Sequence, residues 1–122
     1  MSDDCIFCKI ASGKIPTEKI LDEDNFFSIL NKDPQVEGHA LIISKKHFET
    51  ILDMPNSLGV EFLDCAKKTA LKLMKQHNAG GFNLVTNAFE VAGQSIKHVH
   101  FHLLPRKKDD GCSLALGGKG SL

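Results

Sequence analysis

The sequence contains no tyrosine and no tryptophan, and its net charge is zero because fifteen basic residues balance fifteen acidic ones. A chain without a net positive field has little means of gathering a polyanion, so nonspecific nucleic-acid binding is not expected. RNA-binding motifs that stack bases on exposed aromatic side chains are also disfavoured, because phenylalanine alone is available for stacking. We therefore expect no nucleic-acid partner, while a local anion-binding site stays open.

Long apolar runs are also absent, and no stretch approaches the ~20 apolar residues that a transmembrane helix needs. The first residues, from Met1 to Cys5, are acidic and lack the apolar core of a secretory signal. These features predict a cytoplasmic protein with no membrane partner, in which the four cysteines are reduced. Cys5 and Cys8 are then a candidate metal or redox pair rather than a structural disulfide.

The hydrophobic pattern predicts an α+β domain with about five antiparallel strands, one short helix and one long helix. The short helix is expected over residues 5–13. The long helix is expected over about 58–77, where apolar residues recur every three or four positions and Gly80-Gly81 follow the end. Strands are expected at 19–21, 25–30, 39–43, 82–87 and 97–104, with Pro105 ending the last one.

The same pattern divides the chain into a domain over residues 1–106 and a tail over 107–122. The tail is charged and then rich in glycine, so we expect it to be poorly ordered.

The last expected strand carries three histidines, His98, His100 and His102, at every second position. Alternate side chains of a strand share a face, so the three imidazoles would lie ~7 Å apart along one side of the sheet. Such an arrangement is costly without a use, because protonated rings repel one another and buried rings need hydrogen-bond partners. Metal binding by these three histidines and phosphoryl chemistry are both open interpretations, and phosphoryl chemistry is favoured.

The residues around the histidines explain this preference. A neutral imidazole is a good nucleophile near pH 7, because its unperturbed pKa is about 6.5. Gly93, Gln94 and Ser95 precede the histidines, and Asn87 adds a second amide, so several neutral groups are available to donate to phosphate oxygens.

In this combination the chain resembles the histidine-triad (HIT) family of nucleotide hydrolases and transferases. The resemblance rests on Gly93-Gln-Ser95 before the alternating histidines, and it extends through Asp33-Pro34, Gly38-His39 and Lys45-Lys-His47 over nearly the whole chain. It implies the HIT fold, in which an antiparallel sheet continues across a homodimer and each subunit has one nucleotide site.

The resemblance also implies the roles of the site residues. His100 would attack the α-phosphorus of a purine nucleotide and form a nucleotidyl-histidine intermediate, which water hydrolyses to a nucleoside monophosphate. The other catalytic residues would be His102 at the phosphate, His98 and His39 behind the catalytic ring, and Ser95 at the leaving group. The nucleotide would be bound by Ile6, Phe7, Ile10 and Ile29 around the base, Asn31 at the ribose, and Asn87, Gly93 and Gln94 at the phosphate. This chemistry requires no cofactor.

The residues that would select the leaving group resemble those of two different branches of the family. Asn31 and Leu104-Pro-Arg-Lys107 are similar to Fhit-like dinucleoside polyphosphate hydrolases, whereas Ser95 and Asn87 are similar to the phosphoramidase, Hint-like branch. Hydrolysis of nucleotidyl phosphoramidates or related AMP compounds is the favoured function. The alternatives are hydrolysis of dinucleoside polyphosphates, a purine-nucleotide binding module with incidental turnover, and a zinc-dependent scaffold.

Two interpretations of Cys5 and Cys8 stay open, a structural zinc site and a pair of free thiols. A structural zinc ion needs four nitrogen or sulfur ligands, so two more residues must contribute. Some HIT proteins with this pair use histidines that match His47 and His98, so the resemblance implies a Cys₂His₂ zinc site. His98 would then orient the catalytic residues through the metal and could not act as a free base.

Overall fold

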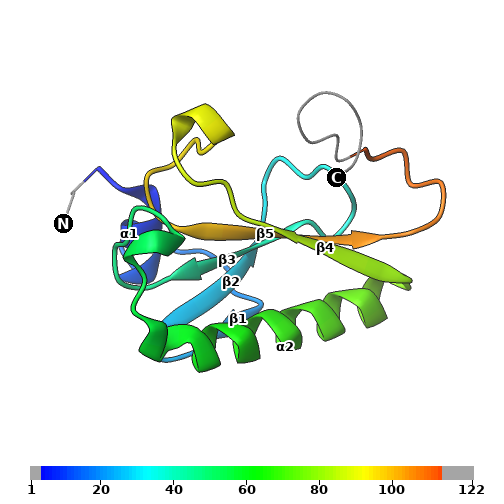
Figure 1. Cartoon of the computed structure of the whole chain (residues 1–122). Helices are drawn as coiled ribbons and strands as arrows, with labels where there is room; N and C mark the ends of the chain where they lie inside the picture. Colours follow the sequence, from blue (N-terminus) through cyan, green and yellow to red (C-terminus); the bar gives the residue numbers. More distant parts are fainter. Residues whose placement is uncertain (1–3, 114–122) are drawn as a thin grey trace.

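The computed structural model describes residues 4–113 and shows five strands, two α-helices and three short 3₁₀ turns (Figure 1). The elements are α1 (Ile6–Ala11), β1 (Leu21–Asp22), β2 (Phe26–Leu30), β3 (Ala40–Ser44), α2 (Gly59–His77), β4 (Gly81–Val85) and β5 (His100–Arg106). The strands form one antiparallel sheet in the order β1-β2-β3-β5-β4, which confirms the predicted α+β class. In the described part of the chain, no helix is long and apolar enough to cross a membrane.

The sheet is buried on both faces. On one face Phe26, Ile42 and Phe101 pack against the apolar side of α2, which runs along the sheet in Figure 1. On the opposite face, which we call the α1 face, buried sheet residues pack against α1; the buried residues of this cluster are Phe27, Ile29, Leu41, Ile43, Cys5, Phe7, Cys8 and Ile10. Helix α1 is short, so it leaves part of this face open.

Strand β5 places two of the three histidines on the α1 face. The register pairs His100 with Ile43 and His102 with Leu41, and paired residues of an antiparallel sheet point to the same side. His98 differs from the prediction, because it precedes the strand and comes from the turn before it. The predicted row of three histidines on one strand is therefore correct for His100 and His102 only.

The end of β5 also differs from the prediction, because Pro105 lies inside the strand, opposite Phe82 of β4. The carbonyl of Arg106 points to the β4 side, where it accepts a hydrogen bond from the N–H of Gly80. Because successive residues of a strand direct their backbone polar groups to opposite sides, the backbone nitrogen of Pro105 faces the β3 side. Pairing with β3 has already ended at Leu103, and no hydrogen bond is lost where proline lacks its N–H.

The boundaries of the other elements are close to those predicted. Asn78, rather than the glycines after it, ends α2: it adopts a left-handed conformation and its N–H donates to the last turn. The first residues of the expected tail form a turn, in which Arg106 Nε donates to Asp110 at 2.7 Å and Arg106 Nη2 donates to the carbonyl of Cys112 at 2.7 Å. Residues 114–122 of that tail lie outside the described residues.

Candidate active site and metal centre

A cleft of about 480 Å³ opens on the α1 face beside the histidines, and its volume is within the roughly 300–1,000 Å³ of small-molecule sites. Its walls include predicted nucleotide-binding residues, namely Ile6, Phe7, Ile10, Ile29, Asn31, Ser95, His100 and His102. The lining thus combines apolar side chains with imidazole, amide, hydroxyl and charged groups. Sequence reasoning missed Ile15, Thr17 and Lys32, which line the same cleft but belong to no recognised motif.

His100 lies at the cleft with its ring against Phe7, at a centroid distance of 5.1 Å. Its Nδ1 is 2.7 Å from the carbonyl oxygen of His98. A carbonyl oxygen can only accept, so Nδ1 carries the proton and Nε2 has a free lone pair. Burial lowers the pKa of His100 below its usual 6.5, an effect that the hydrogen bond to the carbonyl partly opposes. The ring is therefore neutral and nucleophilic at pH 7.

His102 and His39 form a second pair with a defined tautomer. The backbone N–H of Gln35 donates to His39 Nδ1 at 3.0 Å, so the proton of neutral His39 is on Nε2. That Nε2 lies 3.0 Å from Nδ1 of His102, which must accept. His102 therefore carries its own proton on Nε2. Burial lowers the pKa of both rings, and nearby His100 and His39 help to lower that of His102 to about 4.

Gln94 is buried within the loop that leads to the histidines. Its Oε1 accepts from the N–H of Phe89 at 2.7 Å, and its Nε2 donates to the carbonyls of Glu49 at 2.6 Å and Ile96 at 3.0 Å. These bonds occupy the donors of the amide, and the backbone N–H of Gln94 also donates to Phe89. A contact of this side chain with phosphate would require it to give up one of these bonds, so its role in the structure is to fix the loop.

The other predicted phosphate residues lie close together beside this loop. Gly93 has a φ of +99°, a conformation that favours glycine, and a Cβ added to it would lie 3.5 Å from Nδ2 of Asn87. Ser95 lines the cleft, whereas Asn87 and Gly93 are not among the described residues that form its walls.

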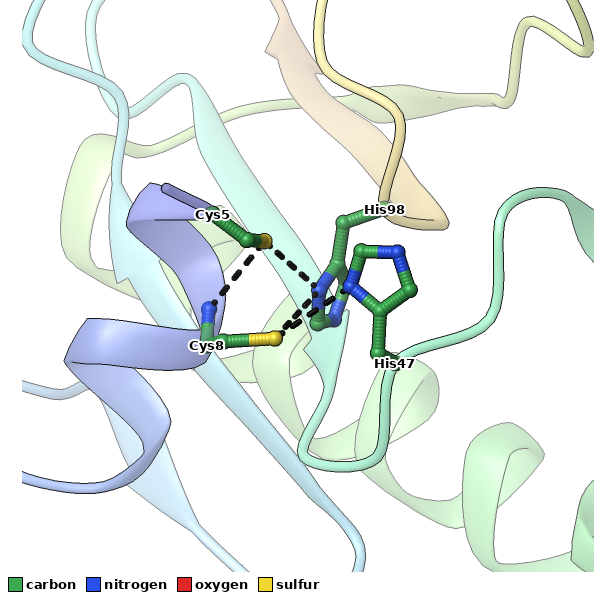
Figure 2. A group of neighbouring side chains, drawn as sticks. All are labelled: Cys5, Cys8, His47 and His98. Carbon is green, nitrogen blue, oxygen red and sulfur yellow. Dashed lines mark hydrogen bonds between the residues drawn. The ribbon is translucent and has the colours of Figure 1, made fainter. Parts of the chain in front are cut away.

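Next to the cleft, Cys5, Cys8, His47 and His98 converge on one point (Figure 2). Their two Sγ and two Nδ1 atoms all lie within 4.8 Å of one another. Cys5 Sγ is 3.2 Å from His98 Nδ1, and Cys8 Sγ is 3.2 Å from His47 Nδ1. Zinc bonds of about 2.3 Å to sulfur and 2.0 Å to nitrogen put tetrahedral ligand atoms roughly 3.3–3.8 Å apart. The spacing of these donor atoms thus fits a zinc ion.

The protonation states of these side chains also fit a metal. His98 is fully buried, and its Nε2 lies 2.7 Å from the carbonyl of Ser44, so the Nδ1 lone pair faces the thiols. Burial and the adjacent Cys5 raise the pKa of Cys8 to about 11, so its thiol stays protonated unless a cation stabilises the thiolate. Two thiols and two imidazoles form a donor set that zinc prefers. The four predicted ligands are therefore suited to structural zinc.

His98 connects the two sites. Its side chain faces the candidate metal centre, while its backbone carbonyl holds Nδ1 of His100. Any displacement of His98 would therefore change the orientation of the His100 ring.

Comparisons with known proteins identify the family of this chain. The HIT domain family matches residues 12–109. An uncharacterised HIT-like protein of Methanocaldococcus jannaschii is 39% identical over 88% of this chain and 82% of its own length. The adenosine 5'-monophosphoramidase HNT1 of Saccharomyces cerevisiae is 39% identical over 93% of this chain and 68% of its own. The crystal structure of a zinc-bound histidine triad family protein from Mycobacterium smegmatis superposes with a TM-score of 0.84 and 31% identity, covering 91% of this chain and 81% of that one. The chain belongs to the HIT domain family, as its sequence predicts.

Proposed function

We propose that the protein hydrolyses nucleotidyl phosphoramidates or related AMP compounds at the α-phosphorus and releases a nucleoside monophosphate. One observation carries this proposal: His100 presents a neutral Nε2 lone pair at the cleft, because its Nδ1 proton is held by a backbone carbonyl. The similarity to HNT1, which is named an adenosine 5'-monophosphoramidase, supports this substrate class.

The reaction proceeds in two displacements at phosphorus. His100 Nε2 forms a bond to the α-phosphorus as the bond to the leaving amine breaks, and the hydroxyl of Ser95, which lines the cleft, assists protonation of that amine. Water then attacks the phosphorus, breaks its bond to Nε2 and returns the neutral ring. Two displacements retain the configuration at phosphorus. The carbonyl of His98 stabilises the ring while it carries positive charge.

The remaining site residues bind the nucleotide in this proposal. Ile6, Phe7, Ile10 and Ile29 contribute the apolar wall for a purine base, and Asn31, which lines the same cleft, binds the ribose. His102 donates its Nε2 proton to a phosphate oxygen and remains neutral, since its Nδ1 accepts from His39.

Zinc has a structural role in this proposal. Bound to Cys5, Cys8, His47 and His98, it would supply a cross-link between α1 and the residues before β5, and no reacting group. The orientation of His100 for the reaction would come from the protein itself, through the hydrogen bond to the His98 carbonyl.

We also propose that the protein is a homodimer in which β4 pairs with its counterpart. Among the described strands, β4 pairs with β5 alone, so its outer edge is free. Its Phe82 and Leu84 are 46% and 41% exposed, and an uncapped edge strand with apolar side chains favours association. None of the four cysteines, all of which are among the described residues, forms a disulfide, and this supports the proposed cytoplasmic location.

Hydrolysis of dinucleoside polyphosphates is the second candidate. Asn31 is neutral and Lys32 lines the same cleft, and both features suit a substrate with additional phosphate groups.

The experiment measures AMP release from adenosine 5′-phosphoramidate and from diadenosine tetraphosphate, side by side, for the wild type and His100→Ala. Preference for the phosphoramidate, with loss of activity in the variant, would support the first candidate. Preference for the dinucleotide would support the second. If the variant matched the wild type on both substrates, His100 would not be the nucleophile.

A further inference from the structure

Asn31 and His39 close the loop that connects β2 to β3. The last sheet pair before the loop is Leu30 with Ala40, and the backbone N–H of Asn31 then donates to the carbonyl of His39 at 2.8 Å. This extends the antiparallel pairing by one position and brings the two side chains together. Asn31 Nδ2 lies 3.4 Å from His39 Nε2.

The orientation of the Asn31 amide is determined by a second contact. The backbone N–H of Asp33 donates to Asn31 Oδ1 at 3.1 Å, so the oxygen is held within the loop and the NH₂ group faces His39. The NH₂ group can only donate, and His39 Nε2 already carries a proton because Nδ1 accepts from Gln35. Two donors therefore face each other across this short distance.

We propose that Asn31 is a positioning residue that keeps the Nε2 proton of His39, which the N–H of Gln35 places there, directed at Nδ1 of His102. Because it presents a donor rather than an acceptor, the Nε2 proton of His39 has a single acceptor nearby, the Nδ1 atom of His102 at 3.0 Å. This hydrogen bond in turn places the proton of neutral His102 on Nε2. The use of that proton to hold a phosphate oxygen rests on the proposed function, whereas the tautomers are properties of the protein without substrate.

A carboxylate at position 31 would reverse this arrangement. One oxygen of Asp would keep the bond from Asp33, and the other would accept the Nε2 proton of His39 in competition with His102. An opposite charge within ~4–6 Å also stabilises the imidazolium form and raises a histidine pKa by roughly 1–3 units.

The surroundings of the pair make this change measurable. The ring of His100 from β5 lies against that of His102, and the charged loop residues Lys32 and Asp33 line the same cleft as His102. Glu37 of that loop is directed instead to His77 and Lys107, at 3.3 and 3.5 Å. Burial is the principal cause of the lowered pKa of both rings, so a new carboxylate would act on rings that are neutral at pH 7.

The test uses long-range ¹H–¹⁵N spectra of the metal-replete protein without substrate, recorded as a function of pH for the wild type and Asn31→Asp. In the wild type, His39 and His102 should both be neutral with the proton on Nε2. In Asn31→Asp the apparent pKa of the pair should rise by about 1–3 units. Asn56→Asp is the matched control: Asn56 is exposed before α2, so the same charge there should leave both rings unchanged.

Two results would overturn the proposal. The first is a wild-type spectrum in which either ring carries its proton on Nδ1, which needs no variant. The second is a folded Asn31→Asp protein whose tautomers and apparent pKa match the wild type. Activity is measured separately: if the wild type hydrolyses the phosphoramidate, the acid limb of the pH–rate profile should move to higher pH in Asn31→Asp. A wild type without turnover would refute the proposed function and leave the spectroscopic result valid.

Discussion

Replacing Gln94 with alanine removes three hydrogen bonds from a buried position at once. Each such bond contributes about 0.5–1.5 kcal/mol net, so their combined loss corresponds to roughly 1.5–4.5 kcal/mol of unfolding free energy. The carbonyl of Glu49 would lose its side-chain donor, the carbonyl of Ile96 would keep the N–H of His98, and the loop that carries Ser95 would be less constrained. We expect lower stability together with lower kcat/KM.

The assay is urea denaturation, followed at equilibrium, in parallel with AMP release. Gln94→Glu is the sharper variant, because it keeps the shape and the acceptor for Phe89 but presents an oxygen to the two carbonyls that accept from Gln94, which repels them. It should be at least as unstable as Gln94→Ala. Gln76→Ala, at an exposed position of α2, is the control and should change neither quantity.

The opposite result would refute this reasoning. If Gln94→Ala kept the wild-type unfolding free energy and changed only KM, the side chain would be a phosphate ligand rather than the residue that fixes the loop.

Three further predictions concern the metal, pH and assembly. Zinc removal or Cys8→Ser should lower stability, and it should also lower activity because His98, whose carbonyl orients His100, would be less well held. Cys112→Ser, which lies outside the cluster, should change neither quantity. Equal stability of the metal-free and zinc-loaded protein would contradict this prediction. The pKa of His102 falls from 6.5 in the unfolded chain to about 4 in the folded protein, so the unfolded chain binds more protons between these two pH values. The urea midpoint of unfolding should therefore decrease as the pH falls through this window. His102→Asn should reduce this dependence of the midpoint on pH, and an unchanged dependence in the variant would contradict the assignment to His102. In sedimentation experiments Phe82→Asp should be a monomer, whereas Leu52→Asp, at another exposed apolar site, should remain a dimer. A dimer in both variants would exclude the β4 interface.

The period-two pattern of the histidines was sufficient to predict that His100 and His102 share a face of the sheet, since this depends on strand geometry alone. The choice of His100 as the nucleophile came from the family resemblance and stays a prediction. The period-two pattern could not predict the position of His98. The backbone N–H groups of His98 and Val99 donate to Ile96 and Phe48, outside the sheet, so the strand begins only at His100. These partners arise from tertiary contacts that no local pattern contains.

The zinc ligands and the histidine tautomers also depend on tertiary contacts that a local sequence pattern does not contain. The Cys5–Cys8 spacing is local, but His47 and His98 come from segments 39 and 90 residues away from Cys8, and only the family resemblance linked them. The proton positions on His39, His100 and His102 depend on Gln35 and on a backbone carbonyl, so they required the folded structure.

If His100 attacks phosphorus, the nucleotidyl-histidine intermediate can be trapped on its ring. Protein mixed with a slowly turned-over phosphoramidate would be quenched in base, in which a phosphorus–imidazole bond survives, then digested and analysed by mass spectrometry. We expect a nucleotidyl group on His100 in the wild type and no adduct in His100→Ala. An adduct on another residue, or turnover with inverted configuration at phosphorus, would contradict it.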